Sequence, residues 1–424
     1  MRARRAAFSW GVAAAAVLAV SLAASSAGAV GRESLIAAAA SAEVSLDGRL
    51  DEPAWAEAPQ VELTQASPRP GAATPYATTV RVLTAGDRVW IGVDCRDPEP
   101  QRLAIHTRVR DRDMAGDDRV SVALDTFGDR RTGYLFEVNA AGTRRDALIA
   151  GPEELSADWD GIWRAAVARD GAGWSVEIEL PTRSLQFRRG AAAWGLNVER
   201  WVARERLSLL WSSPSLDSAV IDLSRAGELA GLAALEQGLG LSLVPYALAR
   251  AVDDRERGRR GGDADAGGEL YYNLTPQLLG AVTLNTDFAE TEVDDLVANF
   301  TRFPLFFPEK RGFFLEGSNQ FEFGLGLSEV FLPFYSRRVG LFAGRLVPIA
   351  GGAKLLGRSG RAGVALLDVE TRSAPVAPAA NLFAGRFTWD VGDRLRLGVV
   401  GTNGDSNGRA DNSLAGVDAV WRTS

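Results

Sequence analysis

Short segments in which apolar and polar residues alternate constrain this fold more than any other feature. They recur between Val44 and Trp421, for example at Val80–Leu83, Val120–Asp125 and Trp174–Leu180. A period of two is typical of strands that bury one face, and clusters of Gly, Asp and Asn separate these segments. The sequence therefore predicts an all-β protein.

The N-terminus has the features of a targeting segment. Three arginines among the first five residues precede an apolar run from Ala6 to Ala24, and Ala27–Ala29 is a small-x-small triplet. This order is typical of a secretory signal peptide, which we expect to comprise residues 1–29. A membrane anchor is the alternative, because the run approaches spanning length. No later run is as long and apolar, so any membrane-spanning part should be a β-barrel.

Two regions with different patterns follow this leader. Residues 42–235 contain many short strands separated by turns, which predicts a β-sandwich. Residues 239–424 contain alternating segments typical of outer-membrane strands, interrupted by a polar insert at residues 253–268 that we interpret as a mobile loop. Seven or eight candidate strands end at Trp421 without a further partner. We therefore expect an incomplete antiparallel barrel that does not close as a monomer.

The composition excludes several classes of protein. Asp and Glu outnumber Lys and Arg by 54 to 47, whereas nucleic-acid-binding proteins carry a basic surface, so we expect no nucleic-acid partner. The chain has one cysteine, Cys95, and one histidine, His106, which excludes metal sites built from clusters of these residues. No G-x-S-x-G motif accompanies the histidine, so a serine hydrolase has no support.

Three phrases of the first region resemble the carbohydrate-binding module family 9. They are Leu46–Trp55 (LDGRLDEPAW), Asp118–Asp125 and Gly173–Pro181, in the order of that family. The resemblance implies a sandwich that binds the ends of sugar chains, often beside a glycoside hydrolase and often with structural calcium. The two tryptophans that clamp the sugar in the family have no counterpart here, and Asn139 is the one polar contact that matches.

Other aromatic and polar side chains of this region could form a sugar site. A sugar packs its C–H faces on aromatic rings and pairs its hydroxyls with Asp, Asn or Arg. The candidate ligand-binding residues are Asn139, Trp159, Trp163, Tyr134, Arg131 and Asp118. Trp159 has acidic neighbours and is the candidate for an exposed platform. The alternative is that the large aromatic residues, Trp163 and Trp174 above all, belong to the sandwich core.

Two groups of carboxylates allow a second kind of chemistry. Asp111, Asp113 and Asp117 are dense enough to hold Ca²⁺, with a solvated acidic loop as the alternative. Glu177 and Glu179 share one face of a predicted strand, as the two carboxylates of a glycosidase would. Apolar neighbours occupy the opposite face, so we expect this pair to face solvent, and we assign no catalytic residue.

Phrases of the second region closely resemble an outer-membrane family of unassigned function, domain of unknown function 5916. They are Leu284–Asp294, Asn299–Ser318 (which contains FFPEKRGFFLEG) and Phe334–Gly340. In that family a family 9-like module precedes a barrel, and the resemblance extends from about Asp47 to the end of the chain. Family barrels are longer, so the resemblance implies a chain that is truncated at its C-terminus or completed by other chains.

The middle phrase has too many prolines and paired charges for a strand of the barrel wall. Glu309, Lys310, Arg311 and Glu316 could form a polar network inside the barrel, which predicts a plug or constriction. A periplasmic connector between the two regions is the alternative.

Together these features predict an exported carbohydrate-binding protein of the outer membrane, with its sandwich in the periplasm or at the cell surface. Its partners would be a glycan and membrane lipid, its role glycan capture or breakdown, and its one candidate cofactor calcium. A barrel transporter or receptor whose sandwich binds a non-sugar ligand is the first alternative. A glycoside hydrolase acting on O-glycosyl bonds, or its accessory, is the second.

Overall fold

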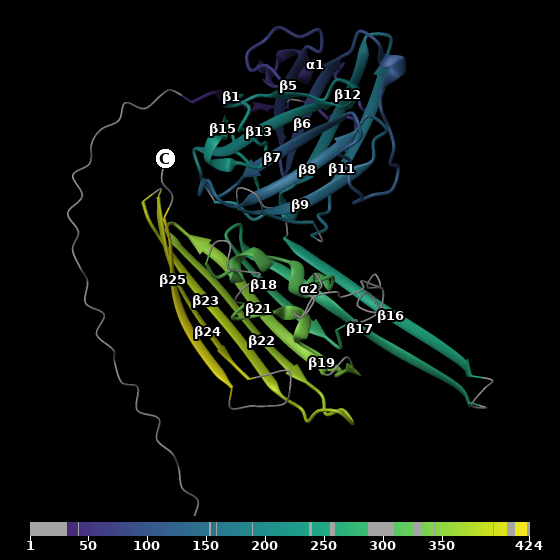
Figure 1. Cartoon of the computed structure of the whole chain (residues 1–424), viewed down its shortest axis with the longest axis vertical. Coiled ribbons are helices and arrows are strands. Elements are labelled where there is room, and N and C mark those ends of the chain that lie inside the picture. Colours follow the sequence, from purple (N-terminus) through teal and green to yellow (C-terminus); the bar gives the residue numbers. More distant parts are fainter. Residues whose placement is uncertain are drawn as a thin grey trace, which may run out of the picture. The chain divides into compact units, whose positions relative to one another are not determined.

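The computed structural model describes residues 32–40, 42–151, 154–157, 159–188, 190–236, 240–254, 259–286, 309–324, 332–342, 345–392, 394–404 and 412–421. The expected signal peptide lies outside these residues. So do residues 287–308 of the segment 284–340, which contains the three phrases of the second region and is called the motif-rich segment below. Within the described residues strands far outnumber helices, which confirms the all-β prediction (Figure 1). None of the described helices has the length and apolar character needed to cross a bilayer.

The first region forms two facing sheets, as predicted for a sandwich. One sheet has the order β1(Ser34–Ile36), β15(Gly227–Ala230), β13(Ala193–Val202), β7(Arg119–Asp125), β8(Gly133–Asn139), β9(Arg144–Gly151), β10(Glu154–Ser156), and β14(Leu207–Leu210) and β4(Thr64–Ser67) extend it from β13. The other has the order β11(Arg164–Asp170), β12(Gly173–Pro181), β6(Arg88–Arg96), β5(Thr78–Ala85), β2(Ala38–Ala39), and β3(Gln60–Glu62) pairs with β5.

Alternate residues of both sheets form one apolar core. It includes Val80 and Ile91 from one sheet and Val122 and Phe136 from the other, all essentially inaccessible to solvent. Burying each such side chain contributes about 1.5–3 kcal/mol, so this core is the main source of the sandwich's stability. The period-two pattern of the sequence reports this core directly, because every second residue of a strand points to the same face.

The prediction that Glu177 and Glu179 face solvent is wrong. They share one face of β12, as expected, but their exposed fractions are 0% and 1%. Glu177 accepts hydrogen bonds from the backbone N–H of Asp47 (3.0 Å) and Gly48 (2.8 Å) and from the indole N–H of Trp55 (3.0 Å). Trp55 lies on the short helix α1(Pro53–Glu57), which the sequence pattern did not reveal. The LDGRLDEPAW phrase is therefore the cover that buries a strand carboxylate.

The second region forms one antiparallel sheet with the order β16(Leu241–Asp254), β17(Arg259–Thr275), β18(Leu278–Leu284), β21(Ile349–Ser359), β22(Ala362–Thr371), β23(Asn381–Val391), β24(Leu395–Asn403), β25(Ser413–Trp421). A two-stranded pair, β19(Leu341–Phe342) and β20(Arg345–Leu346), lies apart from it. The curved sheet begins at β16 and ends at β25, which do not pair with each other in the part of the chain that is described (Figure 1).

The interpretation of residues 253–268 as a loop is wrong for most of that segment. Strand β16 continues to Asp254, and β17 starts at Arg259 and pairs with it residue by residue up to Tyr272. This extension needs no apolar residues, because the ladder is made by backbone N–H and C=O groups. Composition alone could not reveal it.

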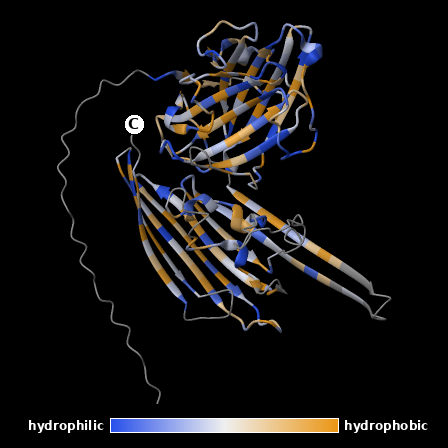
Figure 2. Cartoon of the chain, viewed as in Figure 1, coloured by the Kyte–Doolittle hydropathy of each residue, from blue (hydrophilic) through white to orange (hydrophobic). Residues whose placement is uncertain are grey.

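The two faces of the second-region sheet differ in chemistry, and the strand register separates them. Residues directly opposite on neighbouring strands share a face. One such row runs Phe387, Val399 and Val417, and these three side chains are 48%, 51% and 77% exposed. The opposite face carries Lys354 and Arg386, which are buried. Apolar bands along the strands are visible in Figure 2.

The motif-rich segment covers the buried face of this sheet. Helix α2(Gly312–Leu315) places Phe313 and Phe314 against apolar side chains of the sheet, among them Leu367 and Ala384. Lys354 of β21 donates hydrogen bonds to the backbone carbonyls of Phe313 and Glu316. These contacts hold the segment along the inner face rather than in the wall.

Candidate ligand-binding site

The connection between β7 and β8 is held in shape by two aspartates. The Asp125 carboxylate accepts backbone N–H bonds from all four residues 127–130, and its bond to Arg130 measures 2.6 Å. Gly128 and Arg130 adopt positive φ angles, 69° and 59°, which lets the chain curl around that carboxylate. Asp129 in turn accepts N–H bonds from Arg131 and Thr132. The phrase DTFGDRRTG therefore presents Asp129 in a rigid loop.

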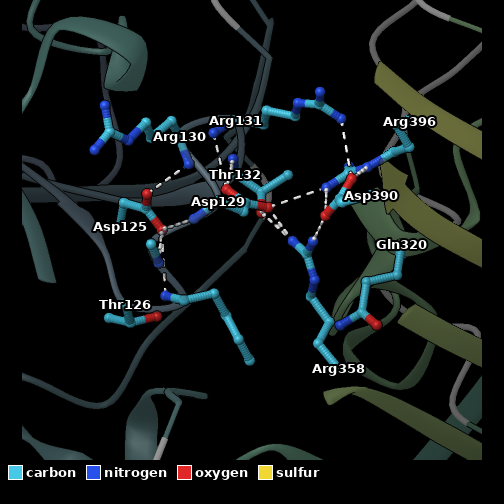
Figure 3. A network of polar contacts seen from close by, with 12 residues as sticks. Asp125, Thr126, Asp129, Arg130, Arg131, Thr132, Gln320, Arg358, Asp390 and Arg396 are labelled. Carbon is cyan, nitrogen blue, oxygen red and sulfur yellow. Dashed lines mark hydrogen bonds and ion pairs between the residues drawn. The ribbon is translucent and has the colours of Figure 1, made fainter. Parts of the chain in front are cut away.

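Asp129 is the centre of an ion network that joins this loop to the second-region sheet (Figure 3). Arg358 of β21 donates to Asp129 and, at 2.6 Å, to Asp390 of β23. Arg396 of β24 also reaches both carboxylates, at 3.2 Å and 2.7 Å. Burial alone would raise the pKa of Asp129, but Arg358 and Arg396 hold it well below its usual range. Arg131 completes the network with a 3.1 Å bond to Asp390.

Charged residues of the motif-rich segment form a second network. Arg311 is 2% exposed, pairs with Glu309 at 2.7 Å and donates to the backbone carbonyls of Val339 and Ser336. Surrounding donors, Arg311 first among them, lower the pKa of Glu309 although burial opposes this. The predicted polar network is therefore real for this pair. Glu316 lies apart from it and accepts the indole N–H of Trp159 at 2.9 Å.

A cavity of about 110 Å³ lies where these elements meet. At about 30 Å³ per water molecule, this volume corresponds to about four water molecules. Its walls come from the 126–134 connection and Gln186 of the sandwich, from residues 316–324 and from strands β21–β25 of the sheet. The lining residues are Thr126, Phe127, Arg131, Thr132, Gly133, Tyr134, Leu148, Gln186, Glu316, Gly317, Asn319, Gln320, Glu322, Gly324, Arg358, Gly363, Val364, Arg386, Thr388, Arg396, Asp418 and Val420.

Three buried polar atoms of this lining have no hydrogen-bond partner among the residues that the structure describes: Nε2 of Gln186, Oε1 of Gln320 and Nε of Arg386. The two glutamines bond to each other at 3.3 Å, which uses only one donor and one acceptor of the pair. Reversing both amides leaves the same balance, one donor and one acceptor, so the conclusion does not depend on their orientation. Arg386 already pairs with Asp418 through two bonds of 2.7 and 2.9 Å. These side chains therefore leave both hydrogen-bond donors and a hydrogen-bond acceptor unused. Each unsatisfied buried group costs about 1–3 kcal/mol.

Two of the six predicted ligand-binding residues, Tyr134 and Arg131, line this cavity. Tyr134 is buried, and its hydroxyl accepts the backbone N–H of Gln186 at 2.9 Å. Trp159 does not line the cavity itself, but its indole N–H donates to Glu316, which does. The expectation that Trp159 is an exposed platform is wrong, because 4% of it is accessible and it packs on Tyr134 and Phe136.

The other three predicted residues lie elsewhere and are buried. Trp163 belongs to the core, as the alternative held, and its indole N–H donates to Asp146 at 3.0 Å. The side chain of Asn139 closes the β8–β9 turn, accepting from the N–H groups of Ala141 and Thr143. Asp118 accepts backbone N–H bonds from residues 104 and 203.

The described residues contain no group of three or more acidic, His or Cys side chains suited to a metal, so Asp111, Asp113 and Asp117 are not brought together as a calcium site. Asp117 is 1% exposed and accepts bonds from the N–H of His106 and from Asn139. Its pKa is lowered by these donors against the effect of burial. Asp113 bonds to the N–H of Ala115, and Asp111 pairs with Arg110. Each of the three carboxylates therefore has its own partner.

The N-terminal part of the second region, which includes the segment along the inner face, matches a known family. Residues 238–347 match DUF5916, a domain of unknown function. No curated protein matches the chain. The DUF5916 match covers β16–β20 and the buried Glu309–Arg311 pair, so it includes the motifs by which the sequence resembled that family.

Solved structures resemble the chain over different lengths. A family 9 carbohydrate-binding module of Caldicellulosiruptor kristjanssonii, in complex with cellotriose, shares 15% identity, with 48% of this chain and 94% of that chain covered and a TM-score of 0.35. A protein of Bacteroides uniformis, provisionally described as carbohydrate-binding, shares 14% over 49% and 100%, with a TM-score of 0.40. The outer-membrane channel DcaP of Acinetobacter baumannii shares 8% over 85% and 93%, with a TM-score of 0.22.

Gln186, Gln320, Arg386 and Asp418 were missed by sequence reasoning. Each is a single polar residue without a motif around it, and they come from four separate segments of the chain. Asp129 belongs to one of the Gly- and Asp-containing clusters that the sequence indicates only as turns. One signal could have identified Arg386: the alternation of β23 places it on the face opposite Phe387, which is the buried face of the sheet.

The burial of Trp159 leads to a prediction about stability. Replacing Trp159 with alanine should lower the free energy of unfolding by about 3–5 kcal/mol, because a large aromatic residue leaves a cavity and Glu316 loses its donor. Urea unfolding of the full chain in detergent measures this change. The control is Ile162→Ala, at a residue that is 57% exposed in the same stretch. Equal, small losses in both variants would show that Trp159 is not packed as described.

Proposed function

We propose that this chain is an exported carbohydrate-binding protein of the outer membrane, in which the polar cavity holds one sugar residue of a glycan. The observation that carries the proposal is the set of unpaired polar atoms of Gln186, Gln320 and Arg386 around one cavity. A ligand with both hydroxyl donors and hydroxyl acceptors matches the mixed donor and acceptor chemistry of these side chains.

The remaining lining also suits a neutral sugar. Phe127, Tyr134 and Val420 offer apolar surface to the C–H groups of a pyranose ring. The charged groups of the cavity are largely engaged already, Arg386 with Asp418 and Arg358 with two carboxylates. A neutral ligand can use the free donors and acceptors without displacing those ion pairs.

Membrane association is supported by the exposed face of the second-region sheet. Soluble proteins rarely expose a continuous apolar surface of this extent. Strands with apolar residues outward and charged residues inward are the pattern of outer-membrane barrels. Besides the row of Phe387, Val399 and Val417, a second exposed apolar row of this face consists of Leu243, Leu270 and Val282, paired across three strands. In this proposal that face contacts lipid, and the segment along the inner face narrows the interior.

A transporter or receptor for a charged ligand is the second candidate. Arg358, Arg386 and Arg396 bring three guanidinium groups to the cavity lining, and anions are commonly held by such groups. An anion would have to compete with Asp129, Asp390 and Asp418 for them. A glycoside hydrolase based on Glu177 and Glu179 is not proposed, because both carboxylates are buried under their own donors.

The proposal predicts a loss of binding on replacing Gln186. A glycan array on the full chain in detergent identifies a neutral ligand, and calorimetry then compares variants. Gln186→Ala should weaken binding by about fivefold to a hundredfold, the scale of one or two lost buried hydrogen bonds. The main-chain bonds of residue 186 to Thr126 and Tyr134 do not depend on the side chain, so the cavity walls should persist.

Two further variants sharpen the test. Arg386→Lys keeps a charge for Asp418 but removes the unpaired Nε, and should also weaken binding. Gln101→Ala changes an exposed glutamine of the sandwich and should leave affinity unchanged. Unchanged affinity in Gln186→Ala, or preferential binding of small anions, would favour the transporter or receptor instead.

A further inference from the structure

All three connections at one end of the second-region sheet are short, whereas three of the four at the other end are long. Because the strands are antiparallel and sequential, successive connections alternate between the two ends. At one end β17 joins β18 through residues 276–277, β21 joins β22 through residues 360–361, and β23 joins β24 through residues 392–394. At the other end the connections span residues 285–348, 372–380 and 404–412.

The sandwich contacts the end with the short connections. Phe187 donates its N–H to the carbonyl of Pro276 at 2.8 Å, within the β17–β18 connection. Asp129 pairs with Arg358 just before the β21–β22 connection and with Arg396 just after the β23–β24 connection. All three short connections or their flanking residues therefore touch the sandwich. The fourth connection of the other end joins β16 and β17, the two longest strands of the sheet, which have 14 and 17 residues.

We infer that the sandwich faces the periplasm and that the opposite end of the sheet, with the β22–β23 connection, faces the cell exterior. Barrels of the bacterial outer membrane have short periplasmic turns and longer extracellular loops. Applied to this chain, that asymmetry assigns the sandwich to the periplasmic side. The inference rests on the proposed outer-membrane location. It deepens that function, because a periplasmic sandwich meets glycans that have already crossed or entered the barrel and does not collect them at the cell surface.

Cysteine labelling in intact cells tests this inference. The one native cysteine, Cys95, is fully buried, and burial raises the pKa of its thiol to about 12, so it should not react. Two matched substitutions add a thiol at exposed alanines: Ala172→Cys in the β11–β12 turn of the sandwich, and Ala379→Cys in the long β22–β23 connection.

A membrane-impermeant maleimide should label Ala379→Cys in intact cells at least about tenfold faster than Ala172→Cys, since the thiol must be accessible to react. After the outer membrane is permeabilised, both should react at similar rates. Labelling of Ala172→Cys alone in intact cells would place the sandwich at the surface and overturn the inference. Labelling of neither before permeabilisation would overturn it too, because the long connections would then not be outside.

Fractionation of the same cells separates the two possible failures. A chain in the outer-membrane fraction with the reversed labelling pattern contradicts the orientation but leaves the membrane proposal intact. A chain released into the soluble periplasmic fraction contradicts the membrane proposal and the orientation with it.

Discussion

Replacing Glu177 with alanine is expected to destabilise the sandwich by about 4 kcal/mol. The substitution leaves three buried donors, the N–H groups of Asp47 and Gly48 and the indole of Trp55, without an acceptor. Each unsatisfied buried donor costs about 1–3 kcal/mol, and the deleted side chain leaves a cavity. Urea unfolding of the full chain in detergent, followed by tryptophan fluorescence, measures the change, since eight of the 11 tryptophans lie between residues 33 and 236.

The matched control for this variant is Glu62→Ala, an exposed glutamate on β3 of the same sheet. It should change the free energy of unfolding by less than about 0.5 kcal/mol, as surface substitutions usually do. A similarly small effect in Glu177→Ala would mean that the LDGRLDEPAW phrase is not held by this carboxylate.

The same residue should make stability depend on pH. Burial raises the pKa of Glu177 to about 7, opposed by the N–H donors of Gly48 and Asp47. A carboxyl group whose folded pKa exceeds its unfolded value, about 4.3, binds its proton more tightly when folded. Its contribution to stability is therefore complete below about pH 4 and is lost as the pH rises towards 7. Glu177→Gln should flatten the stability profile across this range relative to the unaltered chain.

Replacing Asp129 with asparagine is expected to lower the free energy of unfolding by about 3–5 kcal/mol. Arg358 and Arg396 would keep their buried positions but lose one of the two carboxylates that they share. Removing one partner of a buried ion network leaves uncompensated charge, which is more costly than the network's own net contribution. Asp170→Asn, in an exposed turn of the sandwich, is the control and should be nearly neutral.

A double-mutant cycle shows whether the effect comes from the network. Asp129→Asn and Arg358→Gln should couple by about 1–3 kcal/mol, whereas additive effects would contradict the described contact. The pH dependence has the opposite sign to that of Glu177. Because its neighbours hold the pKa of Asp129 below the unfolded value, its contribution is present above about pH 4 and is lost as the pH falls further.

The strands of both regions could be predicted from the sequence because alternation is a local property. In the run Tyr134–Asn139 every second residue is apolar and points into the sandwich core, and β8 contains this run, although its other face is buried as well. The family resemblances added the order of the regions. Strand pairing without apolar residues, as in the extension of β17, leaves no such local trace.

The chemistry of individual side chains required the tertiary structure. On β12 the alternation correctly placed Glu177 opposite the core, but only the fold shows that a loop 130 residues earlier in the chain covers that face. Trp159 appeared exposed from its acidic neighbours and is buried because Tyr134 and Glu316, from distant segments, contact it.

The sequence by itself determined which segments with apolar alternation form strands, since steric preference and hydrophobic periodicity act between near neighbours along the chain. Only the tertiary structure decided which polar groups meet. Gln186, Gln320 and Arg386 lie up to 200 residues apart and surround one cavity because two sheets and a covering segment converge there. No local pattern encodes that convergence, because the energy of an unpaired buried atom depends on everything that surrounds it in space.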